Sequence, residues 1–156
     1  MRIEQLEADS RYLKEIVVFW NQNAIETADC ELSDEEMAGI EQQIIQYCQS
    51  AYGVVHIALD DNDNLIGFGL AAMQKDLVFD TYSGHVVELY VAPLYRKQKA
   101  GQAIVHSLKS WLLAQNVSYI HVFVDVENES AQAFWEKTGF EKEFFVMSEV
   151  DEDEDE

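Results

Sequence analysis

The chain has 156 residues, 48% of them apolar and 12% aromatic, which is enough for one well-buried domain and too few for two ordinary ones. Its formal net charge of −20 repels nucleic acid phosphates and anionic membranes, so neither is an expected partner, and cationic partners are favoured. We expect a single domain over residues 1–150 and an acidic, disordered tail over residues 151–156, where every residue is Asp or Glu.

The residue pattern favours a reducing, cytoplasmic location. Cys30 and Cys48 have neither metal-type spacing nor a catalytic flanking pattern, so we interpret them as buried or idle thiols. Residues 1–10 contain no basic start and no apolar run, and no segment approaches the length that spans a bilayer.

The first third of the chain predicts one strand and two helices. Residues 2–8 alternate imperfectly between apolar and polar side chains, which indicates a strand, and residues 12–20 carry a wide apolar stripe at helical spacing. Ser33 and Glu36 have the spacing of a capping box, so a second helix is expected to begin there. Between Lys14 and Lys75 there is no Lys or Arg, and both helices carry acidic residues on their outer faces.

The remaining elements alternate between strands and helices. The pattern predicts a hairpin of residues 54–59 and 65–70, a strand over 86–91, a helix over 103–114, a strand over 117–126, a helix over 130–138 and one or two strands within 140–150. Gly139 is placed to end the last helix in a left-handed conformation. This order predicts a mixed sheet covered by helices, with a parallel crossover between residues 86 and 126.

Two short motifs in the hairpin suggest functions that we reject. Residues 67–72 fit a dinucleotide-binding fingerprint, but they lie inside a predicted strand and no long helix follows them. Asp60, Asn62 and Asn64 have the spacing of a calcium loop, yet Leu65 occupies the position that needs glycine. We therefore interpret residues 60–64 as a hairpin turn. The chain contains no serine-nucleophile elbow and no phosphate loop that ends in Gly-Lys-Ser/Thr.

The most informative stretch covers residues 86–140, where a strand leads through the basic loop of residues 96–103 into an amphipathic helix. A helix start with small residues and surrounding positive charge favours phosphate binding, because its free amides point at the ligand. The small residues are Ala100, Gly101 and Ala103, and the nearby cations are Lys97 and Lys99. The sequence thus predicts a site for a phosphorylated cofactor.

Two motifs in this stretch resemble those of the GCN5-related N-acetyltransferase (GNAT) family. The family signature Arg/Gln-x-x-Gly-x-Gly/Ala is matched by Gln98-x-x-Gly101-x-Ala103, after the segment Leu89-Tyr90-Val91-Ala92-Pro93-Leu94-Tyr95-Arg96. The family pattern Asn-x-x-Ala-x-x-Phe-Tyr-x-x-x-Gly-Phe is matched from Asn128 to Phe140, with Trp135 in place of Tyr. The resemblance implies an α/β (α+β) fold: a mixed, mostly antiparallel sheet of six to seven strands, flanked by about four helices, with a splayed central strand pair.

The resemblance also implies acetyl-CoA as co-substrate. Amides at the start of the helix would hold its pyrophosphate. In this family the two central strands splay, and free backbone groups of the first one pair with the pantetheine arm and stabilise the thioester oxygen. An asparagine matched by Asn128 bonds the same arm in similar enzymes. The implied cofactor-binding residues are Tyr90, Val91, Gln98, Lys99, Ala100, Gly101, Gln102, Ala103 and Asn128.

Direct attack of an amine on the thioester needs a group that removes a proton, because an amine with a pKa near 10 is mostly protonated at neutral pH. Glu88, beside the implied splay point, is the candidate base; the alternative is a solvated or ion-paired strand glutamate. Trp135 stands where many members have a Tyr that protonates the departing thiolate, and an indole N–H is too weak an acid for this. Ser130, Tyr119 or water are alternatives, and a CoA thiolate can also leave unassisted.

The acceptor is expected to be the primary amine of a small cation, such as a polyamine, an aminoglycoside or an amine metabolite. In this fold the acceptor groove borders the first two helices, and here that half of the chain is acidic. A peptide N-terminus or lysine side chain is the second choice, and the acidity is also explained by solubility alone. Two other classes remain open: a non-catalytic module that binds acyl-CoA, and an acidic interaction protein that uses its tail. A homodimer paired through residues 146–150 is compatible with the sequence.

Overall fold

The structure, a computed structural model, describes residues 1–150, so the predicted acidic tail of residues 151–156 lies outside the described residues. The chain divides into two compact units, Met1–Phe123 and a second unit that begins at Val124. Each unit is described by itself below, and a single domain over residues 1–150 stays a prediction.

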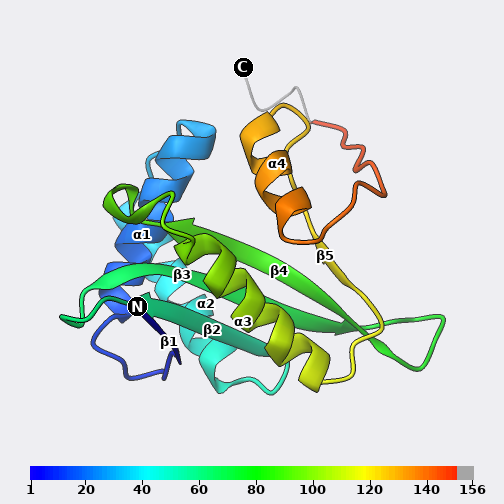
Figure 1. Ribbon diagram of the computed structural model, residues 1–156, viewed down its shortest axis with the longest axis horizontal. Helices are drawn as coiled ribbons and strands as arrows, with labels where there is room; N and C mark the ends of the chain where they lie inside the picture. The colour runs from blue at the N-terminus through cyan, green and yellow to red at the C-terminus, as the bar shows by residue number, and fades with distance from the viewer. Residues whose placement is uncertain (151–156) are drawn as a thin grey trace. The chain divides into compact units, whose positions relative to one another are not determined.

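The first unit is a five-stranded sheet in the order β1-β2-β3-β4-β5, which is antiparallel except for the parallel pair β4 and β5. Its elements are β1 Arg2–Gln5, α1 Leu13–Ala28, α2 Asp34–Gln49, β2 Gly53–Leu59, β3 Leu65–Lys75, β4 Tyr82–Val91, the 3₁₀ turn η1 Pro93–Tyr95, α3 Ala100–Ala114 and β5 Ile120–Val122. Figure 1 shows α3 in front of the sheet and α1 and α2 behind it. The predicted mixed, mostly antiparallel α+β fold is confirmed, with five strands in residues 1–150 instead of six to seven.

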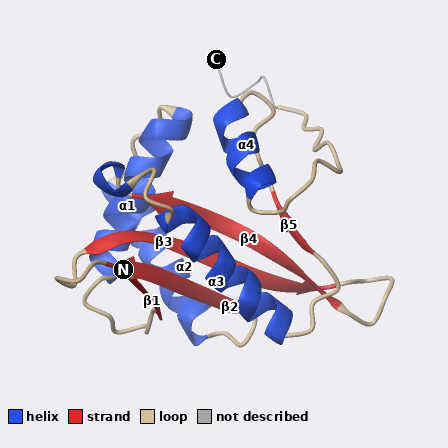
Figure 2. Cartoon of the chain, viewed as in Figure 1, coloured by secondary structure: helices blue, strands red, loops and turns tan. Residues whose placement is uncertain are grey.

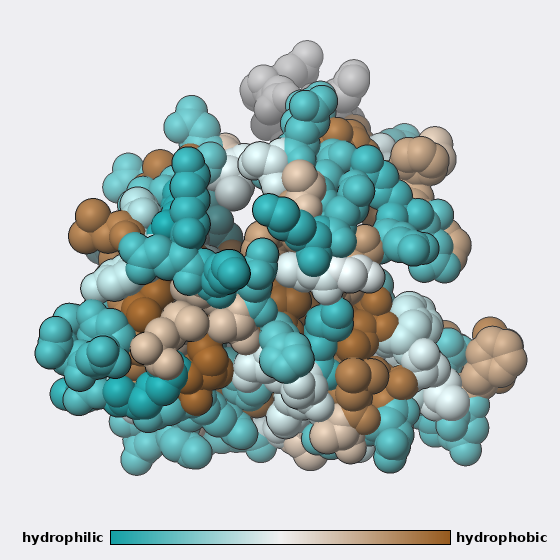
Figure 3. All heavy atoms as spheres, viewed as in Figure 1, coloured by the Kyte–Doolittle hydropathy of each residue, from teal (hydrophilic) through white to brown (hydrophobic). Residues whose placement is uncertain are grey.

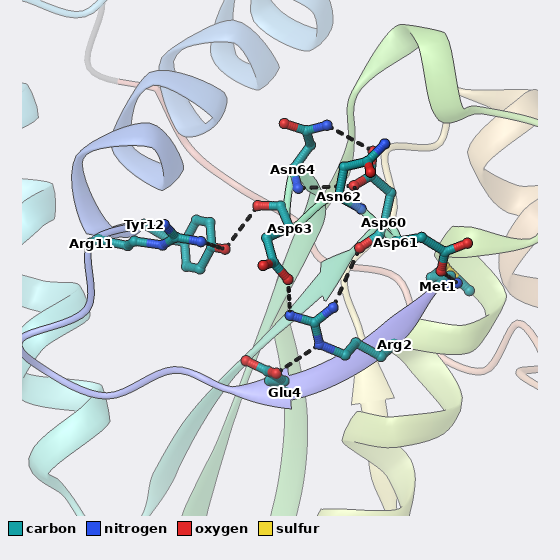
Figure 4. Close-up of polar contacts among 10 residues, drawn as sticks. All are labelled: Met1, Arg2, Glu4, Arg11, Tyr12, Asp60, Asp61, Asn62, Asp63 and Asn64. Carbon is teal, nitrogen blue, oxygen red and sulfur yellow. Dashed lines mark hydrogen bonds and ion pairs between the residues drawn. The ribbon is translucent and has the colours of Figure 1, made fainter.

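Local sequence signals explain where α2 begins and how β2 turns into β3. The Ser33 side chain accepts from the Glu36 amide at 3.1 Å and Glu36 Oε1 accepts from the Ser33 amide at 3.2 Å, so the predicted capping box is present. In the hairpin turn, Asp60 Oδ1 accepts from the amides of Asn62 and Asn64, both at 2.9 Å (Figure 4). These hydrogen bonds, led by that of Asn64, lower the pKa of Asp60 to about 2. Asp60 therefore holds the turn, as the sequence predicted in place of a calcium loop.

The same turn anchors the N-terminal strand. Arg2 forms ion pairs with Glu4 and Asp63 and donates to the Asp60 carbonyl, and the Tyr12 hydroxyl donates to the Asp63 carbonyl at 2.8 Å (Figure 4). β1 ends at Gln5, earlier than predicted; the next residue, Leu6, still donates its amide to the Val55 carbonyl at 2.8 Å, and its side chain is only 2% exposed in the core.

Apolar side chains cover both faces of the sheet. Behind it, α1 and α2 contribute Leu13, Ile16 and Ile44 to a core that contains Phe68 and Leu70 of β3. In front, a Cβ at Gly69 would lie 2.6 Å from Ile104 and 2.7 Å from Leu108, both on α3. Glycine at this position therefore lets the helix approach the sheet closely. Residues 67–72 thus serve helix packing, which explains the glycine pattern that superficially fits a dinucleotide fingerprint.

The long hairpin of β3 and β4 extends past the rest of the sheet, as Figure 2 shows. At its turn, Leu77, Val78 and Phe79 are 100%, 81% and 67% exposed. Figure 3 shows apolar surface at this tip, on the right of the view. The carboxylate of Asp76 accepts from the amides of Val78 and Phe79, so the turn has a defined shape although its side chains are exposed.

β4 contains a bulge that separates it from β5. Leu70 pairs with Glu88 and the next residue, Ala71, pairs with Val86, so Val87 is the extra residue. β5 pairs with β4 only through Gly84, His85 and Val86. From the bulge to its end at Val91, β4 therefore pairs with β3 and with no second strand among residues 1–150. The strand predicted over residues 117–126 is wrong at both ends, since β5 covers only Ile120–Val122. The bulge explains the C-terminal end, because a strand needs a partner and β4 bends away after Val86.

The second unit contains α4, Glu129–Lys137, followed by a segment without regular secondary structure. The strands predicted within residues 140–150 are not formed: this part of the described chain has no ladder partner, and Phe144, Phe145 and Met147 are 83%, 87% and 93% exposed. β-forming composition alone does not make a strand without a neighbour. Among the described residues no helix is long and apolar enough to cross a membrane.

Candidate active site

Glu88 is the acidic residue that the fold singles out. It lies on β4 directly after the bulge, is half-buried, and its Oε1 accepts a hydrogen bond from Asn23 Nδ2 of α1. Burial raises the pKa of Glu88 to about 7, and the hydrogen bond from Asn23 opposes that rise. A carboxyl group with such a pKa can both accept and release a proton near neutral pH.

The contact between Asn23 and Glu88 was not predicted from the sequence. Asn23 lies 65 residues before Glu88, and no motif in the sequence connects the two. Its side chain donates to the charged carboxylate, so removing the donor is expected to raise the pKa of Glu88 further.

We predict that Asn23→Leu raises the pKa of Glu88 by about one pH unit, since a hydrogen bond to a charged group contributes roughly 1.5 kcal/mol or more. Titration of ¹³C-labelled glutamate carboxyl groups measures this directly, with Glu88→Gln to assign the signal. The matched control is Gln22→Leu on the exposed side of α1, which is expected to leave that titration unchanged. An unchanged Glu88 titration in Asn23→Leu would show that the hydrogen bond has no influence on the carboxyl group.

Arg96 connects α1 to the end of β4. Its Nε donates to the Val91 carbonyl at 2.9 Å, and its Nη2 forms an ion pair with Glu26 of α1 at 2.7 Å. The guanidinium also lies 5.3 Å from the centre of the Tyr90 ring. Arg96 belongs to the basic loop in the sequence, but its side chain turns back to the sheet and braces the splayed strand.

The backbone of β4 offers unpaired donors on the side away from β3. The Ala92 amide donates to Ile66 of β3, so by alternation the amides of Val91 and Leu89 point to the opposite side, where the pairing with β5 has already ended. The amide of Tyr90 points towards β3, and its side chain is buried, 3% exposed, against Phe19. Of the two predicted amides, the geometry thus favours Val91, and it adds Leu89, which the sequence prediction did not include.

The start of α3 carries free amides in the predicted loop. α3 begins at Ala100, three residues earlier than expected, and Lys99 before it makes no capping hydrogen bond through its side chain. The first helical hydrogen bond joins the Ala103 amide to the Lys99 carbonyl at 3.0 Å, so the amides of Ala100, Gly101 and Gln102 precede the helical ladder.

Two lysines in this loop adopt the left-handed conformation, which is unfavourable for residues other than glycine. Their φ angles are 63° for Lys97 and 65° for Lys99. Each costs of order 1–2 kcal/mol, and such strain clusters at ligand-binding segments. Both side chains are exposed, as is that of Gln98, which donates to the Leu94 carbonyl at 3.5 Å. The predicted phosphate-binding residues thus follow one another in one loop, in which the amides of Ala100, Gly101 and Gln102 precede the helical ladder and positive charge lies beside them.

Asn128 has a local structural role in the second unit. It is the N-cap of α4, and its Oδ1 accepts from the Ala131 amide at 3.0 Å and from the Ser130 hydroxyl at 3.3 Å. This cap uses the carbonyl oxygen of the side chain. Its role towards the pantetheine arm stays a prediction, and only the amide nitrogen remains for it.

Trp135 packs at the other end of α4. Gly139 has a φ of 102°, as predicted; the Gly139 amide donates to Glu136 and the Phe140 amide to Trp135, both at 3.1 Å. This is a Schellman motif, and the rings of Trp135 and Phe140 make its usual apolar contact with centroids 5.4 Å apart. The indole that stands in place of the family tyrosine thus helps to end the helix.

A sheet that opens between β4 and β5, beside an uncapped helix start, is the arrangement that the GNAT resemblance implies. The model of the Acetyltransferase (GNAT) family matches residues 11–140 of the chain. Because this match covers far more than half of its length, the chain belongs to the GNAT family of acetyltransferases, whose enzymes use acetyl-CoA. No curated protein matches the sequence.

Several solved structures have the same fold at low sequence identity. A possible acetyltransferase from Clostridium difficile 630 has a TM-score of 0.80 and 18% identity, and 96% of each chain is covered. AAC(6')-Iy in complex with the bisubstrate analog CoA-S-monomethyl-acetylneamine has a TM-score of 0.78 and 18% identity over 96% of this chain and 97% of that one. The aminoglycoside acetyltransferase meta-AAC0020 from an uncultured soil metagenomic sample, in complex with sisomicin, has a TM-score of 0.75 and 14% identity, over 96% of this chain and 93% of that one. At these identities the likeness shows the fold.

Proposed function

We propose that this protein is an acetyl-CoA-dependent N-acetyltransferase that moves an acetyl group to the primary amine of a small cationic acceptor in a ternary complex. The observation that carries the proposal is Glu88, a half-buried carboxyl group with a pKa of about 7 at the point where β4 loses its pairing with β5. Acetyl-CoA supplies the activated acetyl group, and the residues of the chain supply the binding groups and the proton acceptor.

The free backbone groups of two segments suit acetyl-CoA. The amides of Ala100, Gly101 and Gln102 would hold the pyrophosphate, with Lys97 and Lys99 as counter-charges. The open edge of β4 would pair with the pantetheine arm, and the Val91 amide would donate to the thioester oxygen. Gln98 and Asn128 keep their implied cofactor roles as part of this proposal. The amides of Tyr90 and Ala103 are directed towards β3 and the Lys99 carbonyl, so these two residues would only shape the site.

Glu88 would remove the proton that the amine must lose. The Glu88 carboxylate, directly or through one water, takes one proton from the ammonium group and leaves the neutral amine as the nucleophile. As the new C–N bond forms and the C–S bond breaks, the sulfur leaves with the electron pair of the C–S bond, and the second amine proton is released to water. Because the pKa of Glu88 is close to neutral, the carboxylate exists at pH 7 and is basic enough to accept the proton. No acid is required for the thiolate to leave, which is compatible with Trp135 in its packed position.

Acidic residues of α1, α2 and their connection favour a cationic acceptor. Part of this acidity has a structural role, because Glu36 closes the capping box and Glu26 pairs with Arg96. Asp29, Glu31 and Glu35 are exposed and add negative charge to the same segment. The named activity of one structural neighbour, the aminoglycoside acetyltransferase meta-AAC0020, supports an aminoglycoside among the candidate acceptors beside a polyamine or an amine metabolite. Peptide amines are the second choice.

Thermal unfolding with acetyl-CoA, CoA and ATP tests the cofactor, and thiol release with a panel of amines tests the transfer. Acetyl-CoA at about a hundred times its Kd should raise the free energy of unfolding by roughly 2.7 kcal/mol, whereas ATP should not. Amine-dependent thiol release then establishes the transferase. Stabilisation without release from any small amine or peptide would favour a non-catalytic acyl-CoA-binding module, and no stabilisation would overturn the proposal.

A further inference from the structure

Four rings gather where β4 and β5 are paired. His85 of β4 stacks on His121 of β5 with ring centroids 4.5 Å apart and planes 19° apart. Phe123 lies 4.8 Å from His85 and 5.5 Å from His121, and Tyr119 lies 5.7 Å from His121. We call these four residues the ring strip. No motif in the sequence indicated the cluster, because the two strands are separated by α3.

The bulge at Val87 places the ring strip on the same face of the sheet as Glu88. His85 pairs with Ala72 and Glu88 pairs with Leu70 on β3, and these β3 residues are two apart, so they point to one face. Without the bulge, residues three apart on β4 would point to opposite faces. This face is the one covered by α1, since Asn23 contacts Glu88 from that side.

The ring strip is partly open to solvent. Burial lowers the pKa of His85 and of His121, and the nearby His121 lowers that of His85 further. His121 Nδ1 is buried without a hydrogen-bond partner among the described residues. Phe123 is 67% exposed and Tyr119 is 51% exposed. An open aromatic surface thus lies on the Glu88 face of the sheet.

We propose that the ring strip is the acceptor subsite of the transferase and that it selects a primary amine carried on a ring. This inference rests on the proposed function and narrows its acceptor. Neutral aromatic faces attract the C–H face of a sugar ring, the face of an aryl ring and a nearby ammonium group. A linear polyamine has no ring face to place on the strip and depends on carboxylates spaced along its length. A ring amine on the strip would instead present its amino group towards Glu88.

Three amines test which kind of acceptor the ring strip binds. Phenethylamine carries an aryl ring, glucosamine carries a sugar ring, and cadaverine is a linear amine without a ring. Binding is followed by the imidazole C–H signals in NMR spectra with CoA present, and turnover by thiol release. Ring amines should shift the signals of His85 and His121, whereas those of His56 and His106, which lie outside the strip, should stay in place. Phe123→Leu, which removes an exposed ring and keeps an apolar side chain, should weaken ring-amine binding roughly three- to tenfold.

Phe79→Leu is the matched control, because Phe79 is also 67% exposed and lies at the tip of the β3–β4 hairpin. It should bind the ring amines as the wild type does. Turnover that is equal for ring and linear amines and unaffected by Phe123→Leu would contradict the proposed role of the ring strip as acceptor subsite. The proposed transferase activity would still stand. Ring-amine binding that depends on Phe123, without turnover of any amine, would support the subsite and contradict the proposed reaction.

Discussion

Glu88→Gln is expected to lower kcat/KM for amine acetylation about 100- to 10,000-fold, the usual contribution of a general base. The substituted amide keeps the size of the side chain and an oxygen that accepts from Asn23, but it cannot take a proton. Binding of acetyl-CoA, read from the thermal shift, should be unchanged. Glu7→Gln, at an exposed position in the segment after β1, removes the same charge and should keep full activity. If Glu88→Gln retained more than about a tenth of the wild-type kcat/KM, Glu88 would not be the base.

The wild type and Glu88→Gln should also differ in how stability depends on pH. The pKa of Glu88 in the folded state, about 7, lies above the ordinary value for glutamate, so the protonated group favours folding. That contribution is complete below the unfolded pKa and is lost as the pH rises through about 7. Wild type should therefore lose free energy of unfolding relative to Glu88→Gln between about pH 5 and pH 8, in chemical denaturation experiments without substrates.

Gly101→Asp is expected to weaken acetyl-CoA binding roughly a hundredfold. The new carboxylate would stand in the first turn of α3, where we place the pyrophosphate, and two like charges about 5 Å apart repel by roughly 3 kcal/mol at an effective dielectric constant near 20. Such a loss corresponds to about two orders of magnitude in Kd. The stabilisation of the fold by acetyl-CoA should disappear at ligand concentrations that saturate the wild type.

This substitution separates binding from folding, because an acidic residue in the first turn of a helix favours the helix. The unliganded variant should therefore unfold close to the wild-type temperature. Gly39→Asp in α2 is the matched control: a Cβ there meets nothing within 4 Å, so the same charge is added on an exposed helix surface. Equal acetyl-CoA affinity in Gly101→Asp and Gly39→Asp would place the pyrophosphate elsewhere.

Elements with local signals were predicted well. The Ser33–Glu36 capping box, the Asp60 turn and the left-handed Gly139 each depend on hydrogen bonds between residues a few positions apart, and each is present. The loop of residues 96–103 was found for the same reason, since strand, small residues and helix follow one another along the chain. Asn128 shows the limit of such reasoning: the sequence analysis gave it only an implied cofactor role, and the structure shows that it is the N-cap of α4.

The sequence by itself determined the GNAT family, the α+β class and the candidate residues Glu88 and Gly101, because these depend on side-chain identity and short spacing. Only the tertiary structure decided that β4 bulges at Val87, that β5 shortens to three residues and that strands are absent from the described residues after Lys137. It also decided the pKa of Glu88 and its contact with Asn23. Strand pairing and burial are set by partners far away in the chain, and no local pattern encodes which partner a β-forming segment will meet.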